Sequence, residues 1–373
     1  MINKKRIIDN FIEMVEISSP SLNEREMADF LKSALEKLGL RVYEDNAGEI
    51  NGGNSGNIIG VLKGKGPQIM FSSHMDTVTP CENIKAKIED GEIKSEGNTI
   101  LGGDDKAGIA AILEMLRVIK EEKLEHPEII IVFSIAEEIG LLGATAFDEK
   151  KFNIKYGFIL DSSGKPGSVV KQAPYHEKIK IKFIGKAAHA GIEPEKGISA
   201  IYMAAKAISK LKIGRIDDET TFNLGIINGG KATNIITEEV EVIGESRSFS
   251  EKKIGETVES AIEICQKVAE EMNGKLEYET EREYDGFSFE DDYKLLKIVQ
   301  KSAEKLGFAY KAESLGGGSD TNVYNAKGID TVNLGIGMKN VHSVDEYIEI
   351  EDIIDGSRLI IELVKGLARD EIK

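Results

Sequence analysis

The segment from Glu128 to Ser134 constrains the fold most, because it carries five large apolar residues in succession, Ile129–Phe133. Such a nearly continuous run is typical of a central strand covered on both faces, whereas a strand with one wet face alternates apolar and polar residues. Shorter apolar strands are predicted at 58–62, 68–73 and 157–160, and a helix at 107–120. This alternation of helices and strands predicts an α/β fold.

The pattern changes near residue 177, where Lys178–Ile184 alternates basic and apolar side chains. Period two predicts a sheet with one wet face. Strands are predicted at 178–184, 221–227, 239–246 and 275–280, and helices at 198–211 and 254–271. The order strand, helix, strand, strand, helix, strand predicts a ferredoxin-like α+β unit. We therefore expect a discontinuous large domain, residues 1–176 and 287–373, with residues 177–286 inserted as a smaller domain.

Composition excludes several classes of protein. The chain has 373 residues, which favours two domains, and 65 acidic against 48 basic side chains give a formal net charge of −17. That balance argues against a nucleic-acid or anionic-membrane binder. Two cysteines, Cys81 and Cys265, cannot build a disulfide framework. The chain shows neither a secretory signal at its start nor an apolar run of about 18 residues, so we expect a cytoplasmic protein.

A helix is predicted after Ser21, because Ser21 and Glu24 have the spacing of a capping box. Apolar residues then recur at helical spacing from Met27 to Leu38.

Polar residues stand where several predicted strands end. His74 and Asp76 follow the strand at 68–73, and side chains two apart in an extended segment share a face. A carboxylate beside an imidazole can orient it for a metal. Asp104 and Asp105 precede a helix, and they are candidate metal ligands or, alternatively, an acidic helix cap. Glu137 and Glu138 follow the apolar strand at 128–134, and they are candidate site residues or, alternatively, part of a solvated turn.

Asp161 and His342 complete the set of polar residues near strand ends. Loops at the strand ends of one α/β sheet are the usual place for a site, so the set predicts a two-metal centre. Carboxylates with imidazoles suit Zn²⁺, and Mn²⁺ or Co²⁺ also fit.

In order along the chain, these motifs resemble those of the co-catalytic zinc peptidases, which include peptidase T, carboxypeptidase G and aminoacylase. The matching segments are His74–Val78, Gly103–Gly108, Glu137-Glu138, Asp161 and His342-Ser343. Gly102–Lys106 and Gly317–Thr321 are most similar to the peptidase T branch. The resemblance covers nearly the whole chain and implies a mixed-sheet zinc-exopeptidase domain with an inserted lid.

The resemblance also implies roles for single residues. His74 and Asp161 would bind one metal, Glu138 and His342 the other, and Asp104 would bridge both. Asp76 would orient His74, and Glu137 would be the general base. A cis peptide bond between Asp104 and Asp105 is implied as well.

In the inserted domain, Gly185–Gly191 matches the family's histidine motif, with Ala190 where proline is frequent. His189 would polarise the scissile carbonyl, and Asn234 and Arg247 would bind substrate. The alternatives are strand-end hydrogen bonding for Asn234 and a surface ion pair for Arg247. Some relatives pair through this lid, so the resemblance allows a homodimer.

The function expected is that of a peptidase T-like aminopeptidase, a tripeptidase acting on short peptides. The chain is shorter than is typical of peptidase T, which leaves peptide length open. A carboxypeptidase or an N-acyl amino-acid deacylase with the same dinuclear site is the alternative. A noncatalytic metal-bound protein is disfavoured, because Glu137 has no role as a ligand.

Overall fold

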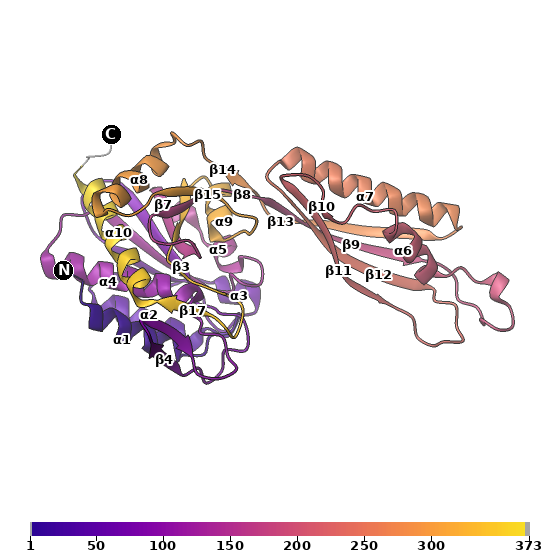
Figure 1. Ribbon diagram of the computed structural model, residues 1–373, viewed down its shortest axis with the longest axis horizontal. Coiled ribbons are helices and arrows are strands. Elements are labelled where there is room, and N and C mark those ends of the chain that lie inside the picture. The colour runs from indigo at the N-terminus through magenta and orange to yellow at the C-terminus, as the bar shows by residue number, and fades with distance from the viewer. Residues whose placement is uncertain (1, 370–373) are drawn as a thin grey trace. The chain divides into compact units, whose positions relative to one another are not determined.

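The computed structural model describes residues 2–369, which form two compact units (Figure 1). The first unit runs from the N-terminus to Lys171, and adds Phe289–Ser314 and the chain from Ser319 onward. The second unit comprises Gln172–Ser288 and Leu315–Gly318.

The first unit is built on a mixed sheet in which strands run in the order β1-β2-β6-β3-β7-β16-β8. Strands β3, β6, β7 and β16 pair in parallel, whereas β1, β2 and β8 join antiparallel. The predicted apolar strand is β6, and residues 129–134 are all buried. The bounds are β1 (Arg41–Glu44), β2 (Ile58–Leu62), β3 (Gln68–His74), β6 (Glu128–Ser134), β7 (Ile154–Ser162), β8 (Ser168–Ala173) and β16 (Thr331–Gly335).

Helices cover both faces of this sheet. Ser73 of β3 lies under α4, whereas the hydroxyl of Ser72 lies 3.5 Å from that of Tyr324 in α9. Since successive side chains of a strand point to opposite faces, α4 and α9 lie in different layers. Helices α1 and α10 pack against α4, and α8 packs against α10. The bounds are α1 (Lys4–Val15), α2 (Arg25–Lys37), α3 (Ala47–Asn51), α4 (Gly103–Glu122), α5 (Leu142–Ala146), α8 (Lys294–Leu306), α9 (Asp320–Ala326) and α10 (Ile350–Ala368).

A small three-stranded sheet, in the order β17-β5-β4, also belongs to the first unit. Its strands are β4 (Ala86–Glu89), β5 (Glu92–Ser95) and β17 (Tyr347–Glu349), and a further strand, β15 (Lys311–Ser314), pairs with β8.

The second unit is an antiparallel sheet in the order β10-β11-β12-β9-β13, with two helices packed on one face. The alternation at 178–184 is realised, because Ile179, Ile181 and Phe183 are buried against the helices. The strand order is ferredoxin-like, with the two-residue β10 added at one edge. The bounds are β9 (Tyr175–Ile184), α6 (Ala200–Ile208), β10 (Gly214–Arg215), β11 (Thr220–Gly229), β12 (Glu239–Ser248), α7 (Glu251–Glu271), β13 (Lys275–Tyr284) and β14 (Phe287–Ser288).

The predicted capping box at Ser21 is wrong. Helix α2 begins at Arg25, and Glu24 occupies the cap position without a hydrogen bond from its side chain to the helix. Both side chains instead reach residues far along the chain, as described below.

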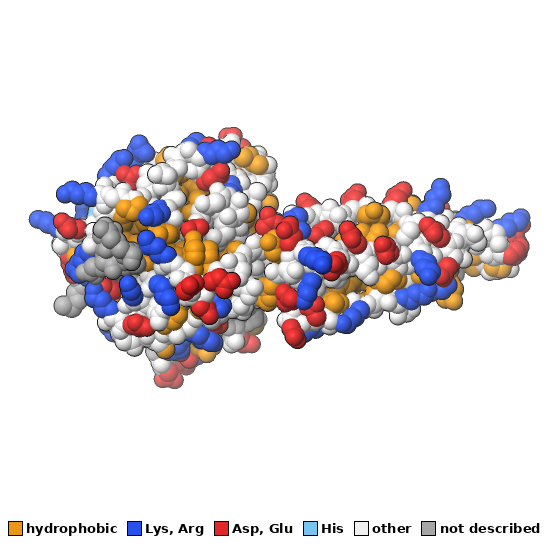
Figure 2. Space-filling model, turned by 90° about the horizontal axis from the view of Figure 1, so that it is seen from above, with side chains coloured by type: hydrophobic (Ala, Val, Ile, Leu, Met, Phe, Trp, Pro, Cys, Tyr) orange, Lys and Arg blue, Asp and Glu red, His pale blue; other side chains and the backbone are white. Residues whose placement is uncertain are grey.

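Acidic and basic side chains are interspersed on the face shown in Figure 2, and neither sign gathers into one large patch there. Within residues 2–369, no helix combines the length and the apolar character that crossing a membrane requires.

Candidate metal centre

The structure brings the five predicted ligands together at one edge of the first unit's sheet. His74 ends β3, Asp161 lies near the end of β7, and Glu138 follows β6. These strands are parallel neighbours, so their carboxyl ends meet at the same edge. Asp104 stands at the start of α4, and His342 lies in the loop after β16.

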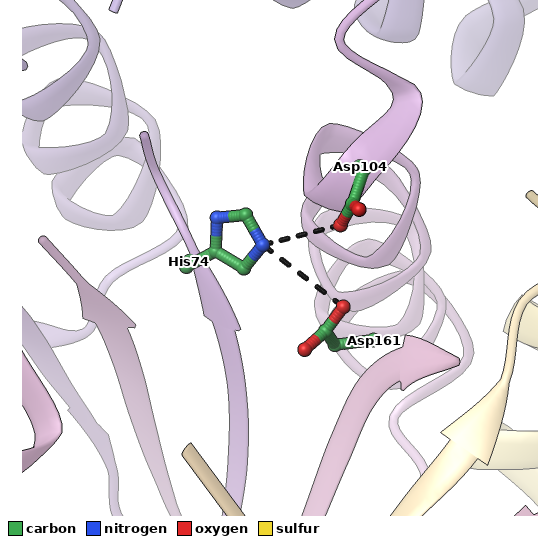
Figure 3. A group of neighbouring side chains, drawn as sticks. All are labelled: His74, Asp104 and Asp161. Carbon is green, nitrogen blue, oxygen red and sulfur yellow. Dashed lines mark hydrogen bonds and ion pairs between the residues drawn. The ribbon is translucent and has the colours of Figure 1, made fainter. Parts of the chain in front are cut away.

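Asp104 is the centre of the cluster. Its Oδ1 lies 3.2 Å from Nε2 of His74, which is also 3.9 Å from Oδ1 of Asp161 (Figure 3). Its Oδ2 lies 3.3 Å from Nε2 of His342, which is also 3.0 Å from Oε2 of Glu138. Two three-residue groups therefore share Asp104, and within each the potential ligand atoms lie within 4.8 Å of one another.

The chemistry of this cluster fits divalent cations. Oε1 of Glu138 is buried and has no hydrogen-bond partner among the described residues. Burial and the neighbouring Asp104 carboxylate raise the pKa of Asp161 well above its usual value. Hydrogen bonding to Asp104 and Glu138 raises the pKa of His342 to about 10. Buried carboxylates that crowd one another need positive charge nearby, and this oxygen and imidazole set suits Zn²⁺ and similar ions.

The turn that carries Asp104 has two notable features. The peptide bond between Asp104 and Asp105 is cis, as the family resemblance implied. The buried carboxylate of Glu346 accepts hydrogen bonds from the backbone N–H groups of Leu101, Gly102 and Asp104, at 2.9, 2.8 and 3.0 Å. Sequence reasoning missed Glu346, and its only signal was an acidic residue four positions after His342.

Gly108 explains how α4 approaches the sheet so closely. A Cβ atom at this position would stand 2.4 Å from Oγ of Ser73 and 2.6 Å from the carbonyl oxygen of Leu160. Only glycine fits between the helix and strands β3 and β7 at this level, which seats the start of α4 beside His74 and Asp161.

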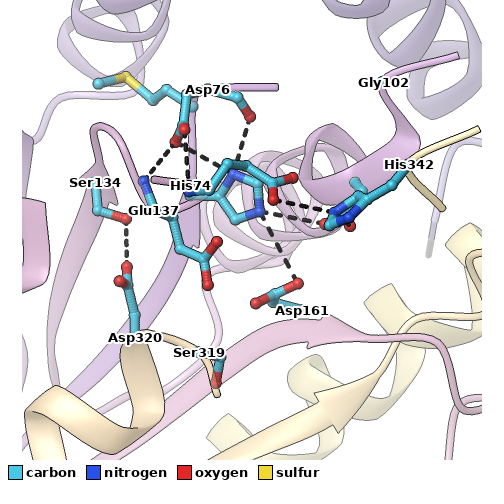
Figure 4. A network of polar contacts seen from close by, with 12 residues as sticks. His74, Asp76, Gly102, Ser134, Glu137, Asp161, Ser319, Asp320 and His342 are labelled. Atoms are coloured by element: carbon cyan, nitrogen blue, oxygen red, sulfur yellow. Dashed lines mark hydrogen bonds and ion pairs between the residues drawn. The ribbon is translucent and has the colours of Figure 1, made fainter. Parts of the chain in front are cut away.

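Asp76 reaches His74, but its carboxylate also holds the turn after β6 (Figure 4). Nδ1 of His74 lies 2.9 Å from the backbone oxygen of Asp76 and 3.4 Å from its Oδ1. The N–H groups of Glu137 and Glu138 donate to Oδ1 and Oδ2 of Asp76, at 2.9 and 3.2 Å. The hydroxyl of Ser21 donates to Oδ2 at 2.7 Å.

Glu137 is buried and lies beside His74 (Figure 4). Potential ligand atoms of Glu137, His74 and Glu138 lie within 4.8 Å of one another. Burial, with further contributions from Asp320 and Glu138, raises the pKa of the Glu137 carboxyl well above the usual range, although His74 opposes the shift. Asp320 in α9 accepts a hydrogen bond from the hydroxyl of Ser134, and burial raises its pKa to about 6.

His189, predicted to polarise the carbonyl, and the predicted substrate-binding residues Asn234 and Arg247 belong to the second unit. His189 and Asn234 are exposed, and their segments are joined by a hydrogen bond of 2.9 Å from the N–H of Ala190 to the backbone oxygen of Asn234. Nε and one terminal nitrogen of Arg247 each lie 3.2 Å from an oxygen of Glu245, and the other terminal nitrogen donates to the backbone oxygen of Gly316 at 3.3 Å. The ion pair considered as the alternative for Arg247 is therefore present.

Comparisons with known proteins match this description. The family model described as Peptidase family M20/M25/M40 matches residues 70–366. Among curated proteins, the chain is 42% identical over 371 residues to "Uncharacterized protein YqjE" of Bacillus subtilis, covering 99% of this chain and 100% of that one.

Two solved structures are also similar over their whole length. A tripeptidase from Staphylococcus aureus is 39% identical with a TM-score of 0.95, over 99% of this chain and 100% of that one. The aminopeptidase PepT from Bacillus cereus is 40% identical with a TM-score of 0.92, over 98% and 99% of the two chains. The match of most of the chain to the family model, together with these relatives, establishes that the chain belongs to peptidase family M20/M25/M40 and is a peptide-bond hydrolase.

Proposed function

We propose that the chain is a metal-dependent exopeptidase of short peptides, and specifically a peptidase T-like aminopeptidase of the tripeptidase kind. The similarity to a tripeptidase and to PepT supports the substrate class. The observation that carries the proposal is the position of Asp104, whose two oxygens each face a different imidazole, with Glu137 beside them.

His74, Asp161 and Asp104 would hold one divalent ion, and Glu138, His342 and Asp104 the other. Bound ions of this kind polarise a carbonyl oxygen and lower the pKa of water toward about 7. Zn²⁺ is the ion we propose, and Mn²⁺ or Co²⁺ also suits the donor set.

Glu137 would act as the general base. Its carboxylate accepts a proton from the attacking water and then delivers that proton to the amine of the departing residue. Asp76 holds the ring of His74 and the backbone of Glu137 in fixed relation.

The second unit would act as the lid. In this proposal His189 polarises the scissile carbonyl, and Asn234 and Arg247 bind the substrate. Exposed apolar side chains of this unit support pairing with a second copy of the chain. They lie on α6, on the part of β11 beyond its pairing with β10, and in nearby loops. They are Ile192, Ile201, Tyr202, Ile226, Ile227 and Ile235. We propose a cytoplasmic enzyme that binds neither nucleic acid nor membrane.

A panel of short peptides with free and blocked termini tests the function. An aminopeptidase loses turnover when the amine is blocked. It keeps its kcat when the carboxylate is blocked, with a higher KM because Arg247 would lose the carboxylate that it binds. Loss of turnover only on blocking the carboxylate would identify a carboxypeptidase, and turnover of N-acyl amino acids alone would identify a deacylase. Either result would refute the aminopeptidase assignment.

A further inference from the structure

Three consecutive backbone N–H groups after β6 donate to buried carboxylates. The N–H of Ala136 donates to Oε1 of Glu24 at 3.0 Å, and those of Glu137 and Glu138 donate to Asp76. Ala136 has a φ of +49°, a left-handed conformation that alanine rarely adopts. This turn therefore needs external support, and the support comes from acceptors outside it.

Glu24 is well placed to give that support. Its side chain is fully buried, and Oε1 also accepts the N–H of Leu22 at 2.8 Å. The segment just before Glu24 is hydrogen-bonded to the residues that follow β3. The hydroxyl of Ser19 donates to the backbone oxygen of Met75 at 2.8 Å, and the N–H of Thr77 donates to the backbone oxygen of Ser19 at 2.9 Å.

The carboxylate of Glu24 has no cation among its hydrogen-bond partners, and Oε2 has no partner among the described residues. Burying such a group is costly. Its contacts are to backbone N–H groups, and one of these belongs to the residue just before Glu137. These contacts therefore fix the position of the backbone at Ala136, and they do not pair the charge of Glu24 with a cation.

We propose that Glu24 is a positioning residue, which fixes the left-handed turn at Ala136 and thereby the directions of Glu137 and Glu138. The inference rests on the proposed roles of those two glutamates as general base and metal ligand. The sequence predicts Ser21 and Glu24 as a capping box. In the structure they instead contact Asp76 and Ala136, which both adjoin the candidate metal centre.

Two conservative variants of Glu24 separate the effect of side-chain length from the effect of charge. Glu24→Asp keeps the charge but shortens the side chain by one carbon–carbon bond, about 1.5 Å, which takes the acceptor beyond hydrogen-bonding distance of Ala136. Glu24→Gln removes the charge but keeps an oxygen in the same place. Glu26→Asp, at an exposed position in the first turn of α2, is the matched control.

We expect Glu24→Asp to lower kcat by about 10- to 100-fold with little change in KM, because small misplacements of reacting groups have effects of this order. Glu24→Gln should stay within about 3-fold of the wild type, and Glu26→Asp should equal it. The visible spectrum of protein loaded with Co²⁺ alone should change in Glu24→Asp and not in Glu24→Gln.

The reverse order of the two variants, or equal kcat and Co²⁺ spectra for Glu24→Asp and the wild type, would overturn the inference. The spectrum does not depend on turnover, so it tests Glu24 separately from the proposed function. The aminopeptidase assignment fails by another result, that of the peptide panel, and normal turnover of Glu137→Gln would refute the role of Glu137 as base, whatever the spectra of the Glu24 variants show.

Discussion

The candidate metal centre and the predicted site residues of the second unit differ in how firmly the fold holds them. In the first unit, His74 and Asp104 are buried, and the backbone of the two turns that carry Asp104 and Glu138 donates to the carboxylates of Glu24, Asp76 and Glu346. In the second unit, His189 and Asn234 are exposed. The difference teaches that the proposed chemical groups are fixed in advance within the first unit, whereas the proposed substrate contacts would come from side chains with fewer restraints. Variants of the two regions should therefore fail in different ways.

Removal of metal should lower turnover more than any substitution, because the proposed chemistry of the first unit requires the bound ions. Exhaustive chelation should abolish turnover, and adding Zn²⁺, Mn²⁺ or Co²⁺ should restore it. Steady-state rates measured beside elemental analysis check this. Full activity in protein proved free of metal would remove the basis for a metal-dependent mechanism.

Glu137→Gln should lower kcat by about 10²–10⁴-fold, because the amide keeps the shape of the side chain but cannot accept the proton. Metal content should stay at the wild-type level, whereas Glu138→Ala should lose metal at one site. Glu125→Gln, in the exposed turn before β6, is the matched control. Near-normal turnover of Glu137→Gln would exclude it as the base.

His189→Ala tests the other side of the comparison. If His189 polarises the carbonyl, its loss should lower kcat by about 10²–10³-fold, the usual effect of removing one donor to a developing oxyanion. Metal content and the thermal unfolding temperature should not change. His126→Ala, in a turn of the first unit at the opposite end of β6, serves as control. If mixing His189→Ala with Glu137→Gln restores activity, the histidine acts across a dimer.

Arg247→Ala should have the smallest effect and should act mainly on KM. A carboxylate anchor binds ground state and transition state alike, so kcat should change little. Arg247 is partly exposed and already shares its charge with Glu245, so we expect KM to rise by about 10-fold. Arg215→Ala, exposed on β10, is the control. A fall in kcat with constant KM would assign Arg247 to the chemistry instead.

Sequence reasoning succeeded where a functional residue follows a strongly patterned element. The apolar run at 129–133 predicted the buried strand β6, and the acidic pair after it pointed to the edge of the sheet. The α/β class and the family followed from such segments. The roles of the site residues remain predictions.

The supporting carboxylates could not be found in this way. Glu24 bonds to a residue 112 positions away, and Glu346 to residues more than 240 positions away. Local spacing contains no information on such contacts. The Ser21–Glu24 spacing predicted a capping box that the structure does not contain, because serine and glutamate also serve as partners in distant hydrogen bonds.

The position of β16 has a consequence for synthesis on the ribosome. Residues 331–335 lie between β7 and β8 in the sheet, with Asn333 opposite Ile159 on one side and Val170 on the other. Both neighbours are made more than 150 residues earlier, and the whole 172–288 segment emerges in between. The second unit can complete its fold while the first still waits for a middle strand. A nascent chain thus carries an apolar sheet without its middle strand while more than 150 residues are made. Exposed apolar surface and unpaired strand edges of this kind make incomplete chains prone to aggregation.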